Sequence, residues 1–475
     1  MAEEAWNEAR LIPTSGINGA DEQERRATSA LLAVMTAVRE FGRGLLQPLG
    51  APSGTVSTYI EVPFILSDKR IYPDGLIRVT RGQRAWTALV EVKTGTNELE
   101  TEQLENYLDV ARDNEFDALI TVSNQIPAMA GQHPTSIDRR KLKRVAIHHW
   151  SWTQVLAEAV MQKEHRGVAD QDQAWILGEL IRYLEHPRSG ALQFDDMGPA
   201  WVTVREAITA GTLRPRDKGL QDVVSRFDAL LRFASLQLGR RLGTEVAPAL
   251  SRKELAEPAL RAQVLVDSLV NTGTMQGAIR IPDTVGLLVV TVDLRANRVT
   301  CHVDLDTPRE GRATTRVNWL VRQLRNAPDS VRVEAFTAHQ RGPGQAALLH
   351  AVRGDPALLV GDAQRDLRSF RVATTSVTGS KRGRGRGTFI DSVLDSVDGF
   401  YGDVMQHLKA WSAAPPRLRD PLVEPLVPTE TALDSNALSS QDGAETSQAS
   451  EASAGEQQLD SQTAGLASES DEPTD

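Results

Sequence analysis

The 475-residue sequence predicts an α/β protein whose N-terminal third forms a mixed sheet flanked by helices. Three observations support this fold class. A helical stripe of apolar residues occupies 21–46, three strand-like runs lie between 57 and 93, and helices alternate with strands over 98–161. Because strands both follow one another directly and are separated by helices, we expect one sheet with helices on its faces, covering about 20–165.

The first helix begins near Asp21, which is its predicted N-cap. Glu24 stands three residues further on, as in a capping box. Glycine and proline residues at 50–54 end the helix. The strand-like runs that follow are 57–65, 71–80 and 85–93.

A second helix is expected at about 98–113, because its apolar residues recur at helical spacing. Two further strands, 116–122 and 144–149, follow it, and a helix at about 151–161 ends the domain. The order α-β-β-β-α-β-β-α implies a mixed sheet flanked by helices.

The rest of the chain predicts three further regions. Residues 170–245 should form a helical connector with a strong amphipathic helix at 217–240, and residues 246–412 an α+β module of unknown function. Residues 413–475 are rich in Pro, then in Ser, Ala, Gln, Glu and Asp, so they should form a disordered acidic tail. The elements expected in the α+β module are 286–293, 298–305, 313–326, 330–336 and 390–411.

The net charge of -10 comes from the C-terminal end of the chain. Residues 421–475 hold 12 of the 63 acidic residues and none of the 53 basic ones, which leaves a body that is near neutral. No run of about 18 apolar residues predicts a membrane span. The acidic N-terminus lacks a signal sequence, and the single cysteine, Cys301, excludes an internal disulfide, so a cytoplasmic protein is expected.

Three charged residues in the N-terminal domain carry the candidate chemistry. Asp74 follows a strand-like run, and Glu91 and Lys93 stand two apart in the next strand, so both face the same side of the sheet. Hydrolysis of a phosphodiester needs a cation that neutralises charge and makes hydroxide available. Two carboxylates suit Mg²⁺ or Mn²⁺, and a lysine suits the attacking water and the transition-state charge.

Each of these motifs also has a purely structural interpretation. Residues 72–75, Tyr-Pro-Asp-Gly, are a good turn sequence, and Glu-x-Lys in a strand is usually a solvated face. A second Pro-Asp pair, Pro282-Asp283, lacks the following Glu-x-Lys. The order of elements, the helical pair Gln103 and Tyr107, and a lysine in a chain with only 9 lysines among 53 basic residues favour the catalytic interpretation.

Residues 72–107 (YPDG, VEVKTG and QLENY) resemble the PD-(D/E)xK nuclease superfamily, which has the restriction-endonuclease-like fold. The resemblance extends to the subgroup with a Gln-x-x-x-Tyr motif. It implies that Asp74 and Glu91 bind Mg²⁺ or Mn²⁺, that Lys93 is the catalytic lysine, and that Gln103 and Tyr107 support the site or contact DNA. The implied function is a DNA nuclease in defence against foreign DNA, stress response or repair.

Members of this superfamily often add a glutamate from the first helix as a further metal ligand. Glu24 is the candidate for that role, with the capping box as its alternative; Glu22 and Glu61 are further possibilities. Some families on this fold have lost activity. The main alternative function is therefore a catalytically inactive scaffold or interaction protein that keeps the nuclease fold.

A separate, basic segment lies at 379–387, where glycine residues alternate with positively charged residues. Its side chains could neutralise the phosphates of a nucleic acid without reading the sequence. A solvated loop, or a loop that pairs with the acidic tail, is the alternative. This segment supports a third hypothesis, an RNA-binding or RNA-cleaving protein, and the C-terminal module or tail could also bind a protein partner. The four cations are Lys381, Arg382, Arg384 and Arg386.

Overall fold

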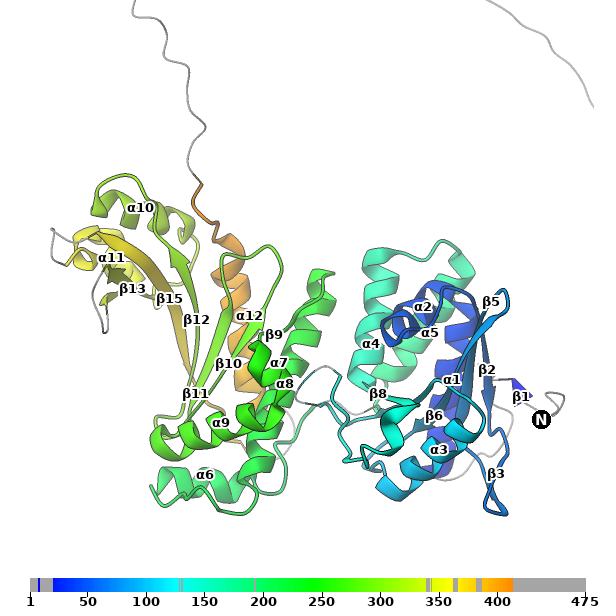
Figure 1. Cartoon of the computed structure of the whole chain (residues 1–475). Helices are drawn as coiled ribbons and strands as arrows, with labels where there is room; N and C mark the ends of the chain where they lie inside the picture. Colours follow the sequence, from blue (N-terminus) through cyan, green and yellow to red (C-terminus); the bar gives the residue numbers. More distant parts are fainter. Residues whose placement is uncertain are drawn as a thin grey trace, which may run out of the picture. The chain divides into compact units, whose positions relative to one another are not determined.

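By its contacts the chain divides once, into Met1–Ala413 and Ala414–Asp475. Among the described residues, the first unit holds two large sheets with separate hydrophobic cores and one two-stranded hairpin (Figure 1). The predicted acidic tail, 413–475, and the predicted contacts Arg382, Arg384 and Arg386 lie outside the described residues. The computed structural model describes residues 7–8, 20–127, 129, 131–191, 194–338, 342, 344–361, 366–381 and 387–412.

The first sheet mixes parallel and antiparallel strands, as predicted. Strands β6, β7 and β8, at one side of the sheet, run parallel, whereas β1, β2 and β5 join them through antiparallel pairs. The parallel strands end at one edge of the sheet. Lys93 and Asn124 are the residues that come directly after β6 and β7 at this edge. In sheet order the strands are β1 (Asn7–Glu8), β2 (Thr55–Ile60), β5 (Gly75–Arg81), β6 (Arg84–Val92), β7 (Ala118–Ser123) and β8 (Ala146–Ser151).

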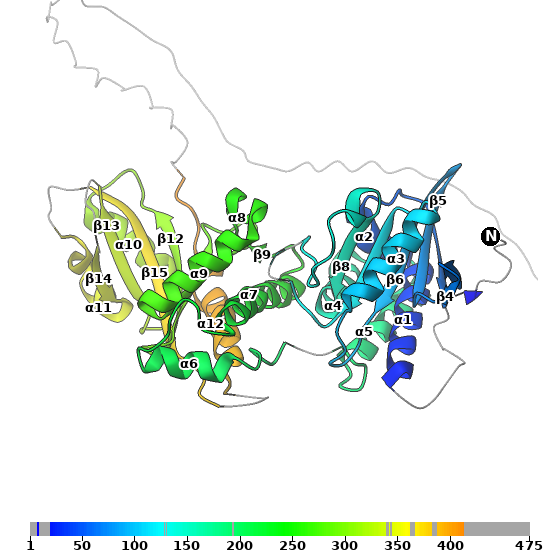
Figure 2. The ribbon, with the colours of Figure 1, turned by 60° about the horizontal axis from the view of Figure 1, so that its bottom comes forward.

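Helices cover both faces of this sheet (Figures 1 and 2). One face packs against α1 (Ala20–Ala37), α2 (Arg39–Leu46), α4 (Trp152–Val160) and α5 (Gln171–Glu185), and the other packs against α3 (Thr101–Asp113). Alternation along β6 separates the two faces: Val90 and Val92 join the core of the first face, and Leu89 joins the core beneath α3. Glu91 shares its face with Leu89 because side chains alternate along a strand.

Two of the predicted strand runs are shorter than expected, because the backbone leaves the extended conformation between them. Glu61 has a left-handed φ of 50° and Pro63 follows it, so β2 ends at Ile60. A separate hairpin of β3 (Phe64–Leu66) and β4 (Lys69–Ile71) precedes Pro73, and β5 begins after it. The single runs predicted at 57–65 and 71–80 were therefore wrong at their junctions.

The first helix also differs from its prediction. It is divided at Val38, whose backbone is extended, into α1 and α2. The helix starts at Ala20, so Asp21 lies inside it and the predicted N-cap at Asp21 was wrong. The Glu24 carboxylate turns away from the helix start and accepts hydrogen bonds from Thr94 and Asn97. The capping-box interpretation of Glu24 is contradicted by these contacts.

The second sheet is antiparallel throughout and packs one face against helices. The alternation of Val299, Cys301 and Val303 places apolar side chains in this core, and Cys301 is fully buried. Strands β10, β14 and β15 were missed from the sequence. In sheet order the strands are β14 (Gln345–Leu348), β13 (Arg332–Thr337), β15 (Leu367–Val377), β12 (Arg298–Asp306), β11 (Leu288–Asp293), β10 (Thr274–Arg280) and β9 (Ala247–Pro248).

Residues of the predicted helical connector, 170–245, are divided between two bodies. The first body is the part of the chain that packs around the first sheet, and the second body is the part that packs around the second sheet. Buried leucines of α5 belong to the first core, and buried residues of α6 and α7 belong to the second. The helices of the second body are α6 (Trp201–Thr209), α7 (Leu220–Leu242), α8 (Arg252–Ala256), α9 (Pro258–Thr272), α10 (Ala313–Gln323), α11 (Leu349–Gly354) and α12 (Phe389–Asp403).

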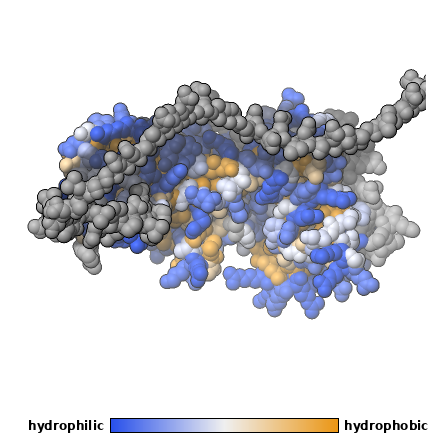
Figure 3. Space-filling view, turned by 90° about the horizontal axis from the view of Figure 1, so that it is seen from above, coloured by the Kyte–Doolittle hydropathy of each residue, from blue (hydrophilic) through white to orange (hydrophobic). Residues whose placement is uncertain are grey.

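The described surface gives no sign of a membrane-spanning segment. No helix among the described residues is both long enough and apolar enough to cross a bilayer. In the space-filling view of Figure 3, hydrophilic residues cover most of the coloured surface, with smaller hydrophobic patches between them.

Candidate active site

Polar side chains form a row across the first sheet, on the face that α3 covers. Glu91 of β6 is the register partner of Thr121 of β7, which in turn is the partner of His149 of β8. Asp74 immediately precedes β5 and borders the same position of β6, because its neighbour Gly75 pairs with Val90. The antiparallel and parallel pairings of the sheet thus bring Asp74 and His149, which lie 75 positions apart in the sequence, into the same row.

Asp74 and Glu91 form a buried carboxyl pair. The Asp74 Oδ2 atom accepts a hydrogen bond of 2.7 Å from the backbone N–H of Val92. Burial raises the pKa of Asp74 above its ordinary value, against the effect of that hydrogen bond. Burial, and next the Asp74 charge, raises the pKa of Glu91 to about 8. Each carboxyl group perturbs the other, so the structure brings the two predicted metal ligands together.

Glu91 is the most enclosed charged group of the site. Its exposed fraction is 1%, and neither carboxylate oxygen receives a well-aligned hydrogen bond. The ammonium group of Lys93 lies 2.7 Å from Oε1, so the pair is held by charge and proximity. Buried polar atoms are rarely left without partners, and a carboxylate with open oxygens on a sheet face is a place where a cation could bind.

Lys93 is fixed by its backbone and directed by two carboxylates. Its N–H donates to Val122 O at 2.8 Å, and its carbonyl accepts from the Trp152 indole N–H at 2.9 Å. Burial disfavours the charge of Lys93, but the neighbouring Glu91 and Glu24 carboxylates outweigh it and raise the pKa. The side chain is therefore a protonated ammonium group at neutral pH, a donor rather than a base.

The three glutamates considered as further ligands have different surroundings. Glu24 reaches the site: its Oε1 accepts from Asn97 Nδ2 at 2.6 Å, and its Oε2 lies 3.7 Å from Lys93 Nζ. Glu22 pairs with Arg26, and Glu61 pairs with Arg25. Among the described residues, no group of three or more His, Cys, Asp or Glu side chains is arranged to hold a metal.

Gln103 and Tyr107 lie on the α3 face beside Glu91. Gln103 Nε2 donates to the Tyr107 hydroxyl at 3.0 Å, and that hydroxyl donates to Tyr72 O at 3.3 Å. Burial, and next the Glu91 charge, raises the pKa of Tyr107 far above its usual range. This helical pair therefore holds the Tyr72–Asp74 turn against the sheet, at the point where Asp74 meets Glu91.

A histidine pair continues the polar row and was not recognised from the sequence as part of it. The Thr135 N–H donates to His133 Nδ1 at 3.1 Å, and His149 Nε2 lies 2.9 Å from Gln125 O. Thr121 Oγ1 lies 2.9 Å from His133 Nε2 and 2.8 Å from His149 Nδ1. With both imidazoles neutral, one assignment of their tautomers provides each group in this chain with one donor and one acceptor.

The low basicity of this pair agrees with that arrangement. Burial lowers the pKa of His133, and burial also lowers the pKa of His149, to about 3. The neutral pair attaches the segment after β7 to the sheet, beside the edge where Lys93 emerges. No sequence pattern signals this pair, because His133 lies in an irregular segment and meets Thr121 only through the tertiary fold.

Short loops close the edge of the sheet around Lys93. Asn124 Nδ2 donates to Gly95 O and to Gly190 O, and the Gly95 N–H donates to Gly190 O. Gly190 has φ of +83°, and a Cβ atom there would lie 2.7 Å from Thr94. These contacts hold the Lys93 segment in place, and they give Asn124 a structural role.

The acidic residues of the second sheet have ordinary partners. Asp304 accepts two hydrogen bonds from Arg371, at 2.7 and 2.8 Å, and Asp293 accepts from the backbone N–H groups of Arg295 and Ala296 in a turn. These contacts fit the structural roles expected of strand and turn residues. Lys381, the described member of the predicted basic segment, is exposed and belongs to the second body.

Comparison of the chain with models of known protein families, with curated protein sequences and with solved structures found no match.

Proposed function

We propose that the chain is a Mg²⁺- or Mn²⁺-dependent nuclease of the PD-(D/E)xK type, with the restriction-endonuclease-like fold, that hydrolyses phosphodiester bonds of DNA. One observation carries the proposal. The carboxyl group of Glu91 is buried beside Asp74 and 2.7 Å from the ammonium group of Lys93, and neither of its oxygens receives a well-aligned hydrogen bond. A merely structural carboxylate in a sheet would be exposed or fully hydrogen-bonded.

The residues present suit a divalent cation. Two buried carboxyl groups whose charges repel each other are costly to ionise together, and a bound cation would remove that cost. Magnesium commonly takes one or two protein carboxylates and completes its ligands with water and substrate phosphate. Asp74 and Glu91 would hold it, and the cation would supply charge neutralisation and hydroxide near neutral pH.

The other side chains of the site would position the reacting groups. The Lys93 ammonium group is able to donate a hydrogen bond to the attacking water or to a phosphoryl oxygen, where negative charge develops. Glu24, whose Oε2 atom lies 3.7 Å from Lys93 Nζ, would limit the movement of the Lys93 side chain. Tyr107 and Gln103 hold the turn that carries Asp74. The proposed reaction is a direct in-line attack of water, without a covalent enzyme intermediate.

Cleavage of plasmid, linear duplex and single-stranded DNA with Mg²⁺ or Mn²⁺ tests this proposal. We expect cutting by the wild type and a loss of roughly 10³-fold or more in Lys93→Ala and Asp74→Asn, because both remove transition-state stabilisation. Lys143→Ala, which removes an exposed lysine of the same domain, is the matched control and should cut normally.

Two results would contradict the assignment. Cutting that survives both substitutions would place the activity at another site. If the wild type cuts none of the substrates and takes up no Mn²⁺ in a calorimetric titration, a catalytically inactive scaffold with the nuclease fold becomes the better description of the chain.

A further inference from the structure

A pocket of about 460 Å³ lies in the first body, beside α2, and is called the α2 pocket below. Its lining comes from the end of α1, from α2 and the turn that follows it, and from adjoining ends of β2 and β5. The volume is within the usual range for a site that encloses a small molecule. The polar side chains of the lining include Arg39, Arg43, Ser53, Thr55 and Thr80.

The α2 pocket and the candidate active site lie at opposite ends of β5. Asp74 immediately precedes this strand, and Thr80, which lines the pocket, is near its other end. About 20 Å of extended chain therefore separates the two places. The pocket is thus a second place on the first body where a ligand could bind.

Two arginines of α2 supply the positive charge of the α2 pocket. Arg39 and Arg43 are four residues apart, so their side chains lie one turn apart on the same face of the helix. Both residues are exposed, and neither side chain has an ion-pair or hydrogen-bond partner among the described residues. Their guanidinium groups are consequently available to a ligand.

No carboxylate of the described lining competes for these cations. The lining contains neither Asp nor Glu. Glu40, which stands between the two arginines in the sequence, is not part of the lining, and its Oε2 atom is buried. The α2 pocket is therefore positively charged and lacks an internal counter-charge.

A third cation stands at the edge of the α2 pocket. Gly54 belongs to the lining, and a Cβ atom added there would lie 3.3 Å from the Cβ atom of Arg81 and would collide with the Thr80 carbonyl. Only glycine lets the turn before β2 approach the end of β5 so closely. Arg81 is exposed and pairs across the next turn with Arg84, which is also exposed. Both arginines add to the positive charge of this end of the sheet.

Hydroxyl groups and an apolar wall complete the α2 pocket. Ser53, Thr55 and Thr80 are exposed, and their hydroxyl groups make no hydrogen bond to another described residue. Hydroxyl groups can donate to an anion. Leu46 and Val79 are buried and line the same pocket, so an apolar part of a ligand would have a surface to cover.

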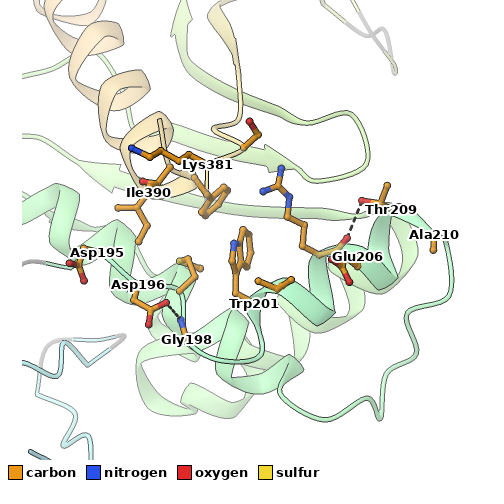
Figure 4. A pocket seen from close by; sticks show the side chains of 15 residues that line it. Asp195, Asp196, Gly198, Trp201, Glu206, Thr209, Ala210, Lys381 and Ile390 are labelled. Carbon is orange, nitrogen blue, oxygen red and sulfur yellow. Dashed lines mark hydrogen bonds between the residues drawn. The ribbon is translucent and has the colours of Figure 1, made fainter. Parts of the chain in front are cut away.

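A larger pocket in the second body lacks this excess of positive charge (Figure 4). It has a volume of about 720 Å³, and Trp201 of α6 and residues at the start of α12 line it. Its cations, Arg205 and Lys381, share the described lining with three carboxylates. An anion would meet repulsion as well as attraction there, whereas the α2 pocket offers cations alone. The three carboxylates are Asp195, Asp196 and Glu206.

We propose that the α2 pocket binds a small organic phosphate, such as a nucleoside monophosphate, with the phosphate group on Arg39 and Arg43 and the organic part on the apolar wall. A phosphate monoester carries a charge of about -1.5 to -2 at neutral pH, which two arginines can balance. The planar guanidinium fork suits its oxygens.

The size of the α2 pocket favours an organic phosphate over a bare anion. One water molecule takes about 30 Å³ of the liquid, so an inorganic ion of a few atoms would fill only part of the space. A ligand with an apolar portion would also cover Leu46 and Val79, whose burial by the ligand adds a hydrophobic contribution to binding.

Titration calorimetry of the full chain with AMP, inorganic phosphate and adenosine tests the proposal. The buffer contains EDTA, so that no metal ion can bring a phosphate to Asp74 and Glu91. We expect AMP to bind more tightly than inorganic phosphate, because only AMP also covers the apolar wall. Adenosine, which lacks the anion, should bind at least about ten-fold more weakly than AMP.

Variants of α2 should locate the binding site. Arg43→Ala and Arg39→Ala should each weaken AMP binding by about ten-fold or more, because each removes a charge-assisted contact. Arg43→Lys keeps the charge but loses the planar fork, so its affinity should lie between those of wild type and Arg43→Ala. The matched control is Arg139→Ala, an exposed arginine of the same body outside the pocket, which should bind normally.

Three outcomes would overturn the proposal. They are an absence of both heat and thermal stabilisation with AMP and phosphate at millimolar concentration, adenosine that binds as tightly as AMP, and an affinity that neither Arg39→Ala nor Arg43→Ala changes. Because both arginines are exposed, these substitutions should leave the fold intact, which circular dichroism checks. The assay involves no cleavage, so its failure would leave the proposed nuclease untouched, and an inactive nuclease would leave the α2 pocket untouched.

Discussion

Both sheets of the protein carry a carboxylate that faces a cation on a strand, yet the two carboxylates respond in opposite ways. In the first sheet, burial raises the pKa of Glu91 to about 8 although Lys93 Nζ lies 2.7 Å away. In the second, the hydrogen bonds from Arg371 lower the pKa of Asp304 below its ordinary value. The distance to the nearest cation is the same in both pairs, so it cannot be the cause of the difference.

Solvation and hydrogen bonding account for the contrast. The side chain of Asp304 is 53% exposed, and its carboxylate accepts two hydrogen bonds from the planar guanidinium group of Arg371. Glu91 is almost completely enclosed, receives no well-aligned hydrogen bond at either oxygen, and stands beside a second acid. Strongly perturbed carboxyl pairs cluster at functional sites, which supports the proposed metal site, whereas Asp304 with Arg371 is an ordinary surface ion pair.

The largest effect should be on metal binding. Glu91→Gln is expected to weaken Mn²⁺ binding at pH 8 by about 100-fold or more, since the loss of groups that only support a ligand already costs 10–100-fold. Asp304→Asn should leave the affinity unchanged. Titration calorimetry on the two variants decides the matter, and equal Mn²⁺ affinity in Glu91→Gln and wild type would remove Glu91 from the site.

The same two substitutions should shift stability in opposite directions in metal-free buffer. In EDTA at pH 8, Glu91→Gln is expected to stabilise the fold by roughly 1–2 kcal/mol, because it removes a buried charge that burial opposes. Asp304→Asn should destabilise it by at most about 1 kcal/mol, because the pair is half exposed and screened by solvent. Urea unfolding followed by circular dichroism measures both, and destabilisation by Glu91→Gln would mean that the carboxylate is well paired after all.

The pH dependence of stability gives a third comparison. The folded state binds the Glu91 proton more tightly than the unfolded state, since the pKa rises from 4.5 to about 8 on folding. Metal-free wild type should therefore lose stability as the pH rises from about 4.5 to about 8, and the advantage of Glu91→Gln should disappear near pH 5. Asp304 has the opposite sign: its contribution is present above pH 3.8 and is lost as the pH falls through its lowered pKa.

Urea midpoints at pH 5, 6.5 and 8 in EDTA test this sign. An advantage of Glu91→Gln that stays constant across these values would show that Glu91 does not titrate in this window. Saturating Mn²⁺ should reverse the wild-type trend, because binding releases the protons of the carboxyl pair.

A smaller effect is expected from Tyr107→Phe. The substitution leaves Tyr72 O without its donor and frees the turn that carries Asp74, so cleavage should fall by about ten-fold and stability by about 1 kcal/mol. Tyr401→Phe, in the second body, is the matched control. Steady-state cleavage and thermal unfolding measure the two effects, and unchanged cleavage would restrict Tyr107 to a packing role.

Much of the candidate site follows from local rules that the sequence obeys. Strand alternation places Glu91 and Lys93 on one face, and helical spacing places Gln103 beside Tyr107, where the structure shows a hydrogen bond. Local rules also failed in places. The Asp21 cap was wrong because the helix begins earlier, and β15 was missed because threonine and serine replace the apolar alternation in its second half.

The sequence by itself determined which of the predicted segments of the first domain are helices and which are strands, and which of their residues share a face, because these depend on neighbours a few positions away. Only the tertiary structure decided that Glu91 is enclosed, that Thr121 meets His133, and that Trp201 and Lys381 line one pocket. Enclosure and proximity are set by segments distant in the chain, such as α3 over β6 or α6 beside the start of α12. No local pattern encodes them, and they are what turns a strand carboxylate into a candidate metal ligand.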